Sequence, residues 1–249
     1  ELPGWRGDPN ALRQAGELST DGLLSAHNRR KKELLTYANS HTGLGFAEGI
    51  LTIGFARRAA AYKRATLLFR DVERITRLAG GRVQFLFAGK AHPRDEAGHR
   101  IIQAVIQAGQ RLDGRVRVGY LVNYTMWSGA LITSGVDVWL NTPLRPYEAS
   151  GTSGMKAALN GVPSASIADG WWAEAARDNE NGWLIGDAEN PDDAADAESL
   201  YKTLEERIVP MYYDRREQWA TVMKQAIATG ADFTAARMIN DYKNQYYGS

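Results

Sequence analysis

The sequence contains no cysteine and only four histidines in 249 residues. The absence of cysteine excludes disulfides, thiolate zinc sites, iron–sulfur ligation and cysteine nucleophiles, and it favours a reducing compartment such as the cytoplasm. The histidines lack the HExxH spacing of a zinc enzyme, so no metal site is expected. They are scattered along the first half of the chain: His27, His41, His92 and His99.

Long apolar runs and a charge excess are also missing. No run of about 18 apolar residues exists, and the N-terminus has neither the basic nor the apolar region of a signal peptide, so no membrane partner is expected. Thirty Lys and Arg residues balance 29 Asp and Glu residues, which gives no reason to expect a nucleic-acid partner. The chain begins at Glu1 without an initiator methionine, which indicates a piece of a longer protein.

Short apolar runs alternate with helical patterns through the middle of the chain. This alternation predicts an α/β fold, a Rossmann-like doubly wound parallel sheet with helices on both faces. The expected strands cover 50–55, 83–88, 116–118, 136–140, 164–168 and 183–186. The expected helices between them cover 64–79, 95–110, 124–134 and 154–161.

Helical patterns also precede and follow this core. Residues 21–40 have the spacing of one amphipathic helix, and apolar side chains recur at helical spacing from Ala194 onward. We therefore expect a single domain closed by two or three C-terminal helices. Its parts are a helical lead-in (1–45), a parallel α/β core (46–190) and the C-terminal helices (191–249).

Cationic side chains follow the first expected strand. Arg57, Arg58, Lys63 and Arg64 lie within eight positions, at the expected junction of a strand and a helix. Ligands of open α/β sheets collect at the carboxyl ends of the strands, so this cluster is a candidate anion site. The N-terminus of the following helix would add N–H donors to the Arg and Lys side chains. A solvated basic helix start is the alternative interpretation.

A loop rich in glycine and hydroxyl side chains follows the fourth expected strand. Thr152 and Ser153 lie between Gly151 and Gly154, and the chain then enters a helix that carries Lys156. Such a loop can direct several backbone N–H groups at one phosphate. It is not a Walker A loop, which needs glycine at position 149 and lysine at 155. A lysine beside a phosphate cradle can form a Schiff base with an aldehyde cofactor, although for a lone lysine a charge on the helix surface is the simpler interpretation.

Two further loops are weaker candidates. His92 lies in a turn after the second expected strand, where a surface histidine is the simpler interpretation. Trp171 and Trp172 follow the fifth strand, and paired tryptophans could stack on a sugar or could belong to the core.

Three motifs, in this order, resemble the C-terminal domain of the α-glucan (glycogen, starch and maltodextrin) phosphorylases, and most closely the short bacterial type. They are RAAAYKR at 58–64, GKAHP at 89–93 and EASGTSGMKAALNG at 148–161. The likeness runs from about residue 20 to the end, and the motif around Lys156 is the most specific. The resemblance implies the C-terminal half of a two-Rossmann-domain glycosyltransferase, with the N-terminal domain absent from this chain.

The resemblance also implies a reaction. Inorganic phosphate would cleave the terminal α-1,4-linked glucose of a glucan to give glucose 1-phosphate with retained configuration, and pyridoxal phosphate on Lys156 would act through its phosphate group. The family's functional positions, carried over to this sequence, imply three sets of residues. The catalytic residues would be Lys156, Arg58 and Lys63, of which Arg58 and Lys63 would bind the substrate phosphate. Glucose would contact Tyr62, Glu148, Ser150 and Gly151, and the cofactor phosphate would be surrounded by Thr152, Ser153, Arg57 and Tyr124. The resemblance leaves a homodimer open.

The sequence departs from the muscle-type phosphorylases at two positions near the cofactor phosphate. Thr125 stands where those enzymes have an arginine and Arg57 where they have a lysine, so the cofactor phosphate is expected to be held differently. The missing domain supplies a glycine-rich loop, a catalytic-site histidine and most of the glucan-binding surface, so the isolated chain is expected to be inactive.

Two other functions stay open. One is a retaining transferase with a nucleotide-sugar donor; such enzymes commonly have a second carboxylate eight residues after the first, where this sequence has Lys156. The other is a non-catalytic remnant that binds phosphate or carbohydrate.

Overall fold

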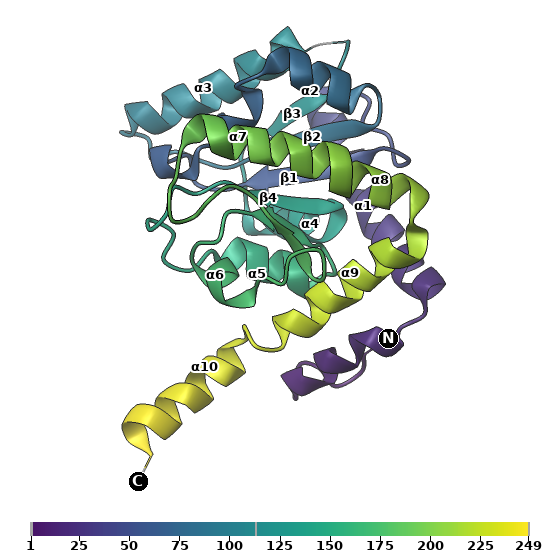
Figure 1. Ribbon diagram of the computed structural model, residues 1–249, viewed down its shortest axis with the longest axis vertical. Helices are drawn as coiled ribbons and strands as arrows, with labels where there is room; N and C mark the ends of the chain where they lie inside the picture. The colour runs from purple at the N-terminus through teal and green to yellow at the C-terminus, as the bar shows by residue number, and fades with distance from the viewer. Residues whose placement is uncertain (1, 113, 249) are drawn as a thin grey trace.

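The computed structural model describes residues 2–112 and 114–248. Its centre is a six-stranded parallel sheet in the order β3-β2-β1-β4-β5-β6, flanked by helices (Figure 1). The strands are β1 (Leu51–Ala56), β2 (Val83–Ala88), β3 (Val118–Leu121), β4 (Val138–Asn141), β5 (Ser164–Ser166) and β6 (Gly182–Leu184). The predicted doubly wound α/β fold is therefore confirmed.

The two faces of the sheet bury separate apolar clusters, because successive strand residues point to opposite sides. On one face Ile53 and Phe85 pack with side chains of α2 (Val72–Ala79), α3 (Glu96–Arg111) and α7 (Asp193–Lys202). On the other face Leu86 and Trp139 pack with α1 (Thr20–Thr42), α4 (Met126–Gly135) and α5 (Thr152–Leu159). Each strand of the centre is therefore covered on both sides, as its continuous apolar sequence requires.

One predicted helix is wrong in its first half. The pattern over 64–79 predicts one helix, but α2 begins at Val72, and short 3₁₀ turns at Ala61–Lys63 and Leu67–Phe69 precede it. Arg64 has a left-handed backbone (φ 47°), which interrupts a helix, and the Asp71 side chain caps α2 by accepting the Arg74 N–H at 2.8 Å. The cation cluster is therefore not followed by the helix N-terminus that the sequence pattern predicts.

The C-terminal third contains more helical segments than the two or three expected. After α7 come a π-helical turn (Thr203–Ile208), α8 (Val209–Asp214), α9 (Arg216–Gly230), α10 (Ala235–Tyr242) and a second π-helical turn (Lys243–Tyr247). A 3₁₀ helix near the N-terminus, Pro9–Glu17, packs on α9. In Figure 1 α10 extends away from the sheet at the lower left.

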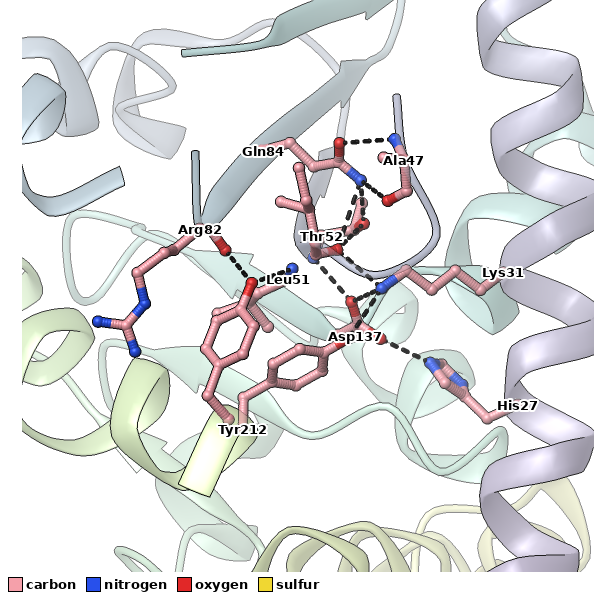
Figure 2. A network of polar contacts seen from close by, with 11 residues as sticks. His27, Lys31, Ala47, Leu51, Thr52, Arg82, Gln84, Asp137 and Tyr212 are labelled. Atoms are coloured by element: carbon pink, nitrogen blue, oxygen red, sulfur yellow. Dashed lines mark hydrogen bonds and ion pairs between the residues drawn. The ribbon is translucent and has the colours of Figure 1, made fainter. Parts of the chain in front are cut away.

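A buried polar network ties α1 to the amino-terminal end of the sheet (Figure 2). Asp137, just before β4, is 3% exposed and accepts the Lys31 ammonium at 2.6 Å. It also accepts the backbone N–H of Thr52 at 2.7 Å and lies 3.0 Å from Nε2 of His27. Lys31 in turn donates to Tyr212 Oη at 3.0 Å, which brings α8 into the network.

The Asp137 carboxylate is charged in this network. Burial is the largest single influence and raises its pKa, but attraction to Lys31 and hydrogen bonding to His27 together outweigh it and hold the pKa of Asp137 below its ordinary value. Burial, and then the nearby Asp137 charge, raise the pKa of Tyr212. The network lies at the opposite end of the strands from the cation cluster, so we assign it to stability.

Candidate active site

The candidate site lies where the strand order reverses. β1 is paired with β2 on one side and β4 on the other, and the chain runs outward in opposite directions from this point. Arg57 directly follows β1, and the loop 142–151 directly follows β4. This reversal is the general ligand-binding position of open α/β sheets.

Glu148 is the centre of the charged cluster. Its carboxylate forms an ion pair with the Arg57 guanidinium and accepts the Lys63 ammonium at 3.1 Å and 3.4 Å. Arg57 also donates to the side chain of Asn141, the last residue of β4. The side chains of Arg57, Lys63 and Glu148 are between 4% and 9% exposed, so their charges interact more strongly than on a wet surface. Two cations share one carboxylate, which leaves the cluster able to accept another anion.

Arg64, the fourth cation of the motif, is used in a different way. Its guanidinium donates to the carbonyl oxygens of Thr142 and Pro143 at 3.0 Å and 2.9 Å, and it forms ion pairs with Asp193 and Asp196 of α7. Arg64 therefore fixes the start of the loop after β4 to a C-terminal helix. It is a structural residue and does not face the site.

Arg58 and Tyr62 border the cluster. The Arg58 side chain is exposed, and no carboxylate pairs with it among the residues that the structure describes. The ring of Tyr62 lies with its centre 4.7 Å from the Lys63 ammonium and 6.2 Å from the ring centre of Tyr147. Arg58 is thus a cation available to a ligand.

The start of α5 presents unused donors. Gly151, with φ 84°, precedes the helix and provides no side-chain cap. The N–H groups of Thr152 and Ser153 and both hydroxyls have no hydrogen-bond partner in the described ranges. A helix start without a cap attracts an anion through these N–H groups and the helix dipole.

Lys156 lies one turn further along α5. Its side chain is exposed and unpaired within the described part of the chain. It lines a groove of about 730 Å³ together with Thr152, Trp171, Phe233 and Tyr242, and the groove is open between α5 and α10. The ammonium group can therefore be reached by a small molecule.

The remaining sequence candidates lie outside this cluster. Tyr124 is half-buried at the start of α4, burial raises its pKa, and no described hydrogen bond joins it to another predicted site residue. Its neighbour Thr125 caps α4 by accepting the N–H of Ser128, a purely local role. His92 is exposed, as expected for a surface turn, and Trp171 is 3% exposed, so it belongs to the core and offers no sugar-stacking surface.

Sequence reasoning missed Asn141 and Asp169. Asn141 joins Arg57 to Ser166 of β5 through its amide, which donates to the Ser166 hydroxyl at 3.1 Å. Asp169 accepts the backbone N–H of Glu148 at 2.8 Å. Both polar residues end or follow a buried apolar strand, and that position was the available signal.

A model of the carbohydrate phosphorylase family matches residues 4–205. The chain belongs to this family. The match covers the whole sheet and all the residues of the charged cluster, so the motif-based resemblance is confirmed.

Individual phosphorylases are similar over most of the chain. Maltodextrin phosphorylase of Thermococcus litoralis is 45% identical over 80% of this chain and 25% of its own length. Glycogen phosphorylase of Aquifex aeolicus is 44% identical over 82% of this chain and 31% of its own length. An uncharacterized protein of Methanocaldococcus jannaschii is 32% identical over 98% of this chain and 46% of its own length. The chain therefore spans between a quarter and a half of the relatives it matches.

No described helix has the length and apolar character needed to cross a bilayer. The described side chains contain no group of three or more His, Asp or Glu arranged to bind a metal ion.

Proposed function

We propose that this phosphorylase-family chain is the cofactor- and phosphate-binding half of an α-glucan phosphorylase. In the complete enzyme, phosphate would cleave terminal α-1,4-linked glucose to give glucose 1-phosphate with retained configuration. The observation that carries the proposal is the contact of Arg57 and Lys63 with Glu148, near the end of the loop that leads to α5 and Lys156. The cations follow the carboxyl end of β1, and the uncapped N–H groups and the accessible lysine follow the carboxyl end of β4.

The donor set fits pyridoxal phosphate. Lys156 offers a free amine in a groove that is also lined by the aromatic side chains of Phe233 and Tyr242, which suits a planar ring. The N–H groups and hydroxyls of Thr152 and Ser153 would hold the cofactor phosphate, and the resemblance assigns Arg57 and Tyr124 to the same phosphate. When bound, the cofactor would supply a phosphate group able to exchange a proton with the substrate phosphate.

The substrate roles that we propose depend on which charged side chains already have a partner in the structure and which do not. Arg58 and Lys63 would hold the substrate phosphate, because two phosphate groups side by side repel each other and need cations between them. Glucose would lie against Tyr62, Ser150 and Gly151, and its hydroxyl groups would donate hydrogen bonds to the Glu148 carboxylate. The Glu148 carboxylate pairs with both Arg57 and Lys63, so we propose that phosphate binding draws Lys63 away from it.

Glu148→Gln is expected to raise the affinity of the chain for inorganic phosphate by roughly fivefold to tenfold. The amide no longer competes for Arg57 and Lys63 as a charged group does, since hydrogen bonds to charged groups are worth about 1.5–3 kcal/mol and neutral ones about 1 kcal/mol. Calorimetric titration with phosphate measures the change. Glu180→Gln, which alters an exposed partner of Arg177, is the matched control and should have no effect. Equal or weaker phosphate binding by a folded Glu148→Gln variant would contradict the exchange of partners.

The proposal as a whole is tested by ligand choice and turnover. The chain is expected to bind inorganic phosphate more tightly than ADP-glucose or UDP-glucose in calorimetry, because no second carboxylate occupies position 156. Supplied with pyridoxal phosphate, the isolated chain is expected to release no glucose 1-phosphate from maltodextrin and phosphate, because we place most of the glucan-binding surface in the part of the phosphorylase relatives that this chain does not cover. Preference for a nucleotide sugar would support the transferase alternative, and turnover at an ordinary enzymatic rate would refute the half-site proposal.

A further inference from the structure

Asp169 is a buried carboxylate that the proposed reaction does not use. The residue is 5% exposed and follows β5 by three positions. Its two oxygens accept backbone N–H groups, that of Glu148 at 2.8 Å and that of Gly170 at 3.0 Å. No cation pairs with it in the described part of the chain. A buried carboxylate needs hydrogen-bond donors to offset the loss of water, and here the two backbone N–H groups are those donors.

The residues after Asp169 continue the contact with the same loop. The backbone N–H of Trp171 donates to the carbonyl oxygen of Ser150 at 2.8 Å. Gly170 has φ 55° and lies so close that an added Cβ would stand 2.6 Å from that carbonyl oxygen. The turn at 169–171 therefore lies directly along the loop at 148–150, with two hydrogen bonds between them and no room for a side chain.

The Trp171 indole extends this contact to α5. A Cβ on Gly154 would stand 2.6 Å from the indole nitrogen, and one on Gly151 would stand 3.2 Å from the ring. The loop that carries Glu148 and the helix start that precedes Lys156 are thus both shaped against one turn of the chain.

We propose that Asp169 is a positioning residue for Glu148. Glu148 is itself buried, so without Asp169 its backbone N–H would have no acceptor and the loop would move to find one. The bond from Asp169 keeps the Glu148 carboxylate between Arg57 and Lys63. The functional part of this inference rests on the proposed phosphate site, whereas the hydrogen bond itself does not.

The test compares Asp169→Ala with Asp169→Asn. The alanine variant removes both acceptor oxygens, whereas the asparagine variant removes the charge and the acceptor for Gly170 but keeps one oxygen that can accept the Glu148 N–H. Amide hydrogen exchange at Glu148, followed by NMR, should be faster by about tenfold or more in Asp169→Ala and within about threefold of the original rate in Asp169→Asn. Asp187→Ala is the control, because Asp187 also accepts backbone N–H groups but lies in an exposed loop.

Phosphate affinity is a second measurement, and it connects the hydrogen bond between Asp169 and the Glu148 N–H to the proposed phosphate site. If Asp169 holds Glu148 between the cations, Asp169→Ala should raise phosphate affinity about as much as Glu148→Gln does, and the double variant should gain nothing further. Asp169→Asn should bind phosphate as the original chain does. A general loss of stability would not produce this pattern.

The outcomes separate the two proposals. Unchanged Glu148 exchange in a folded Asp169→Ala variant would overturn the positioning role, and so would equal acceleration in Asp169→Asn. If the alanine variant does not fold, the asparagine variant still decides, since loss of Glu148 protection there contradicts the proposal and retention supports it. If the original chain binds no phosphate while exchange behaves as expected, the proposed function fails and the positioning role stands.

Discussion

Replacement of Lys156 by alanine is expected to abolish fixation of pyridoxal phosphate, whereas Lys90→Ala leaves it unchanged. Lys156 lies one turn after the uncapped start of α5. The N–H groups of that helix start can bind the cofactor phosphate, while the Lys156 amine reacts with the cofactor aldehyde. The chain is incubated with pyridoxal phosphate and reduced with borohydride, and the modified peptide is identified by mass mapping. We expect one modified lysine per chain in the original protein and none above background in Lys156→Ala.

Lys90 makes a demanding control. It is also exposed and also follows a strand of the same sheet, at the carboxyl end of β2, but it has no glycine and hydroxyl loop beside it. A general affinity of surface amines for the aldehyde would label both lysines. Labelling at a lysine other than 156, or equal labelling of both variants, would exclude the cofactor site.

The Asp137→Asn substitution is expected to lower the free energy of unfolding by about 3–5 kcal/mol, which is the usual effect of removing one partner of a buried ion pair. The loss leaves the Lys31 ammonium, 1% exposed, without its counter-charge, and it weakens the bond to the Thr52 N–H. Urea unfolding at neutral pH measures the difference. The exposed pair of Asp21 and Arg216 supplies the control, because Asp21→Asn should change stability by less than about 1 kcal/mol.

The same network predicts how stability depends on pH. The pKa of Asp137 is lower in the folded than in the unfolded protein, so its contribution is fully present above the unfolded value of about 3.9 and is lost as pH falls toward and through the folded value. The stability difference between the original chain and Asp137→Asn should therefore be constant above about pH 5 and should shrink below about pH 4. A difference that persists unchanged to pH 3 would contradict a charged Asp137.

Much of the fold could be predicted because parallel strands are local apolar runs. The predicted segments over 83–88 and 50–55 coincide with β2 and, within one residue, with β1, since both strands are buried on both faces and read as continuous hydrophobic sequence. The prediction of one helix over 64–79 failed because the apolar residues of this region are shared between the 3₁₀ turn Leu67–Phe69 and α2. The interruption comes from Arg64, whose guanidinium is held by carbonyl oxygens some 80 positions away, and such a contact leaves no periodic signal.

The site divides in the same way. The cations at 57–64 and the loop that leads to Lys156 can be recognised as motifs. Each is a contiguous run of residues that are uncommon in an apolar core, basic residues in the first and glycine, serine and threonine in the second. The pairing of both Arg57 and Lys63 with Glu148 was not predictable, since it joins segments separated by more than 80 positions. The role of Asp169 was not predictable for a further reason: its position after β5 is a signal, but its partner is a backbone N–H, which every residue has and no sequence pattern marks.

The sequence by itself therefore determined the doubly wound α/β fold and the phosphorylase family, because hydrophobic periodicity and contiguous motifs are local properties of the chain. Only the tertiary structure decided which charges meet: Arg57 and Lys63 at Glu148, Arg64 at α7, and Lys31 at Asp137. The reason is physical. A buried charge is tolerated only where folding brings an opposite charge or a hydrogen-bonding group to it, and that partner can come from anywhere in the sequence.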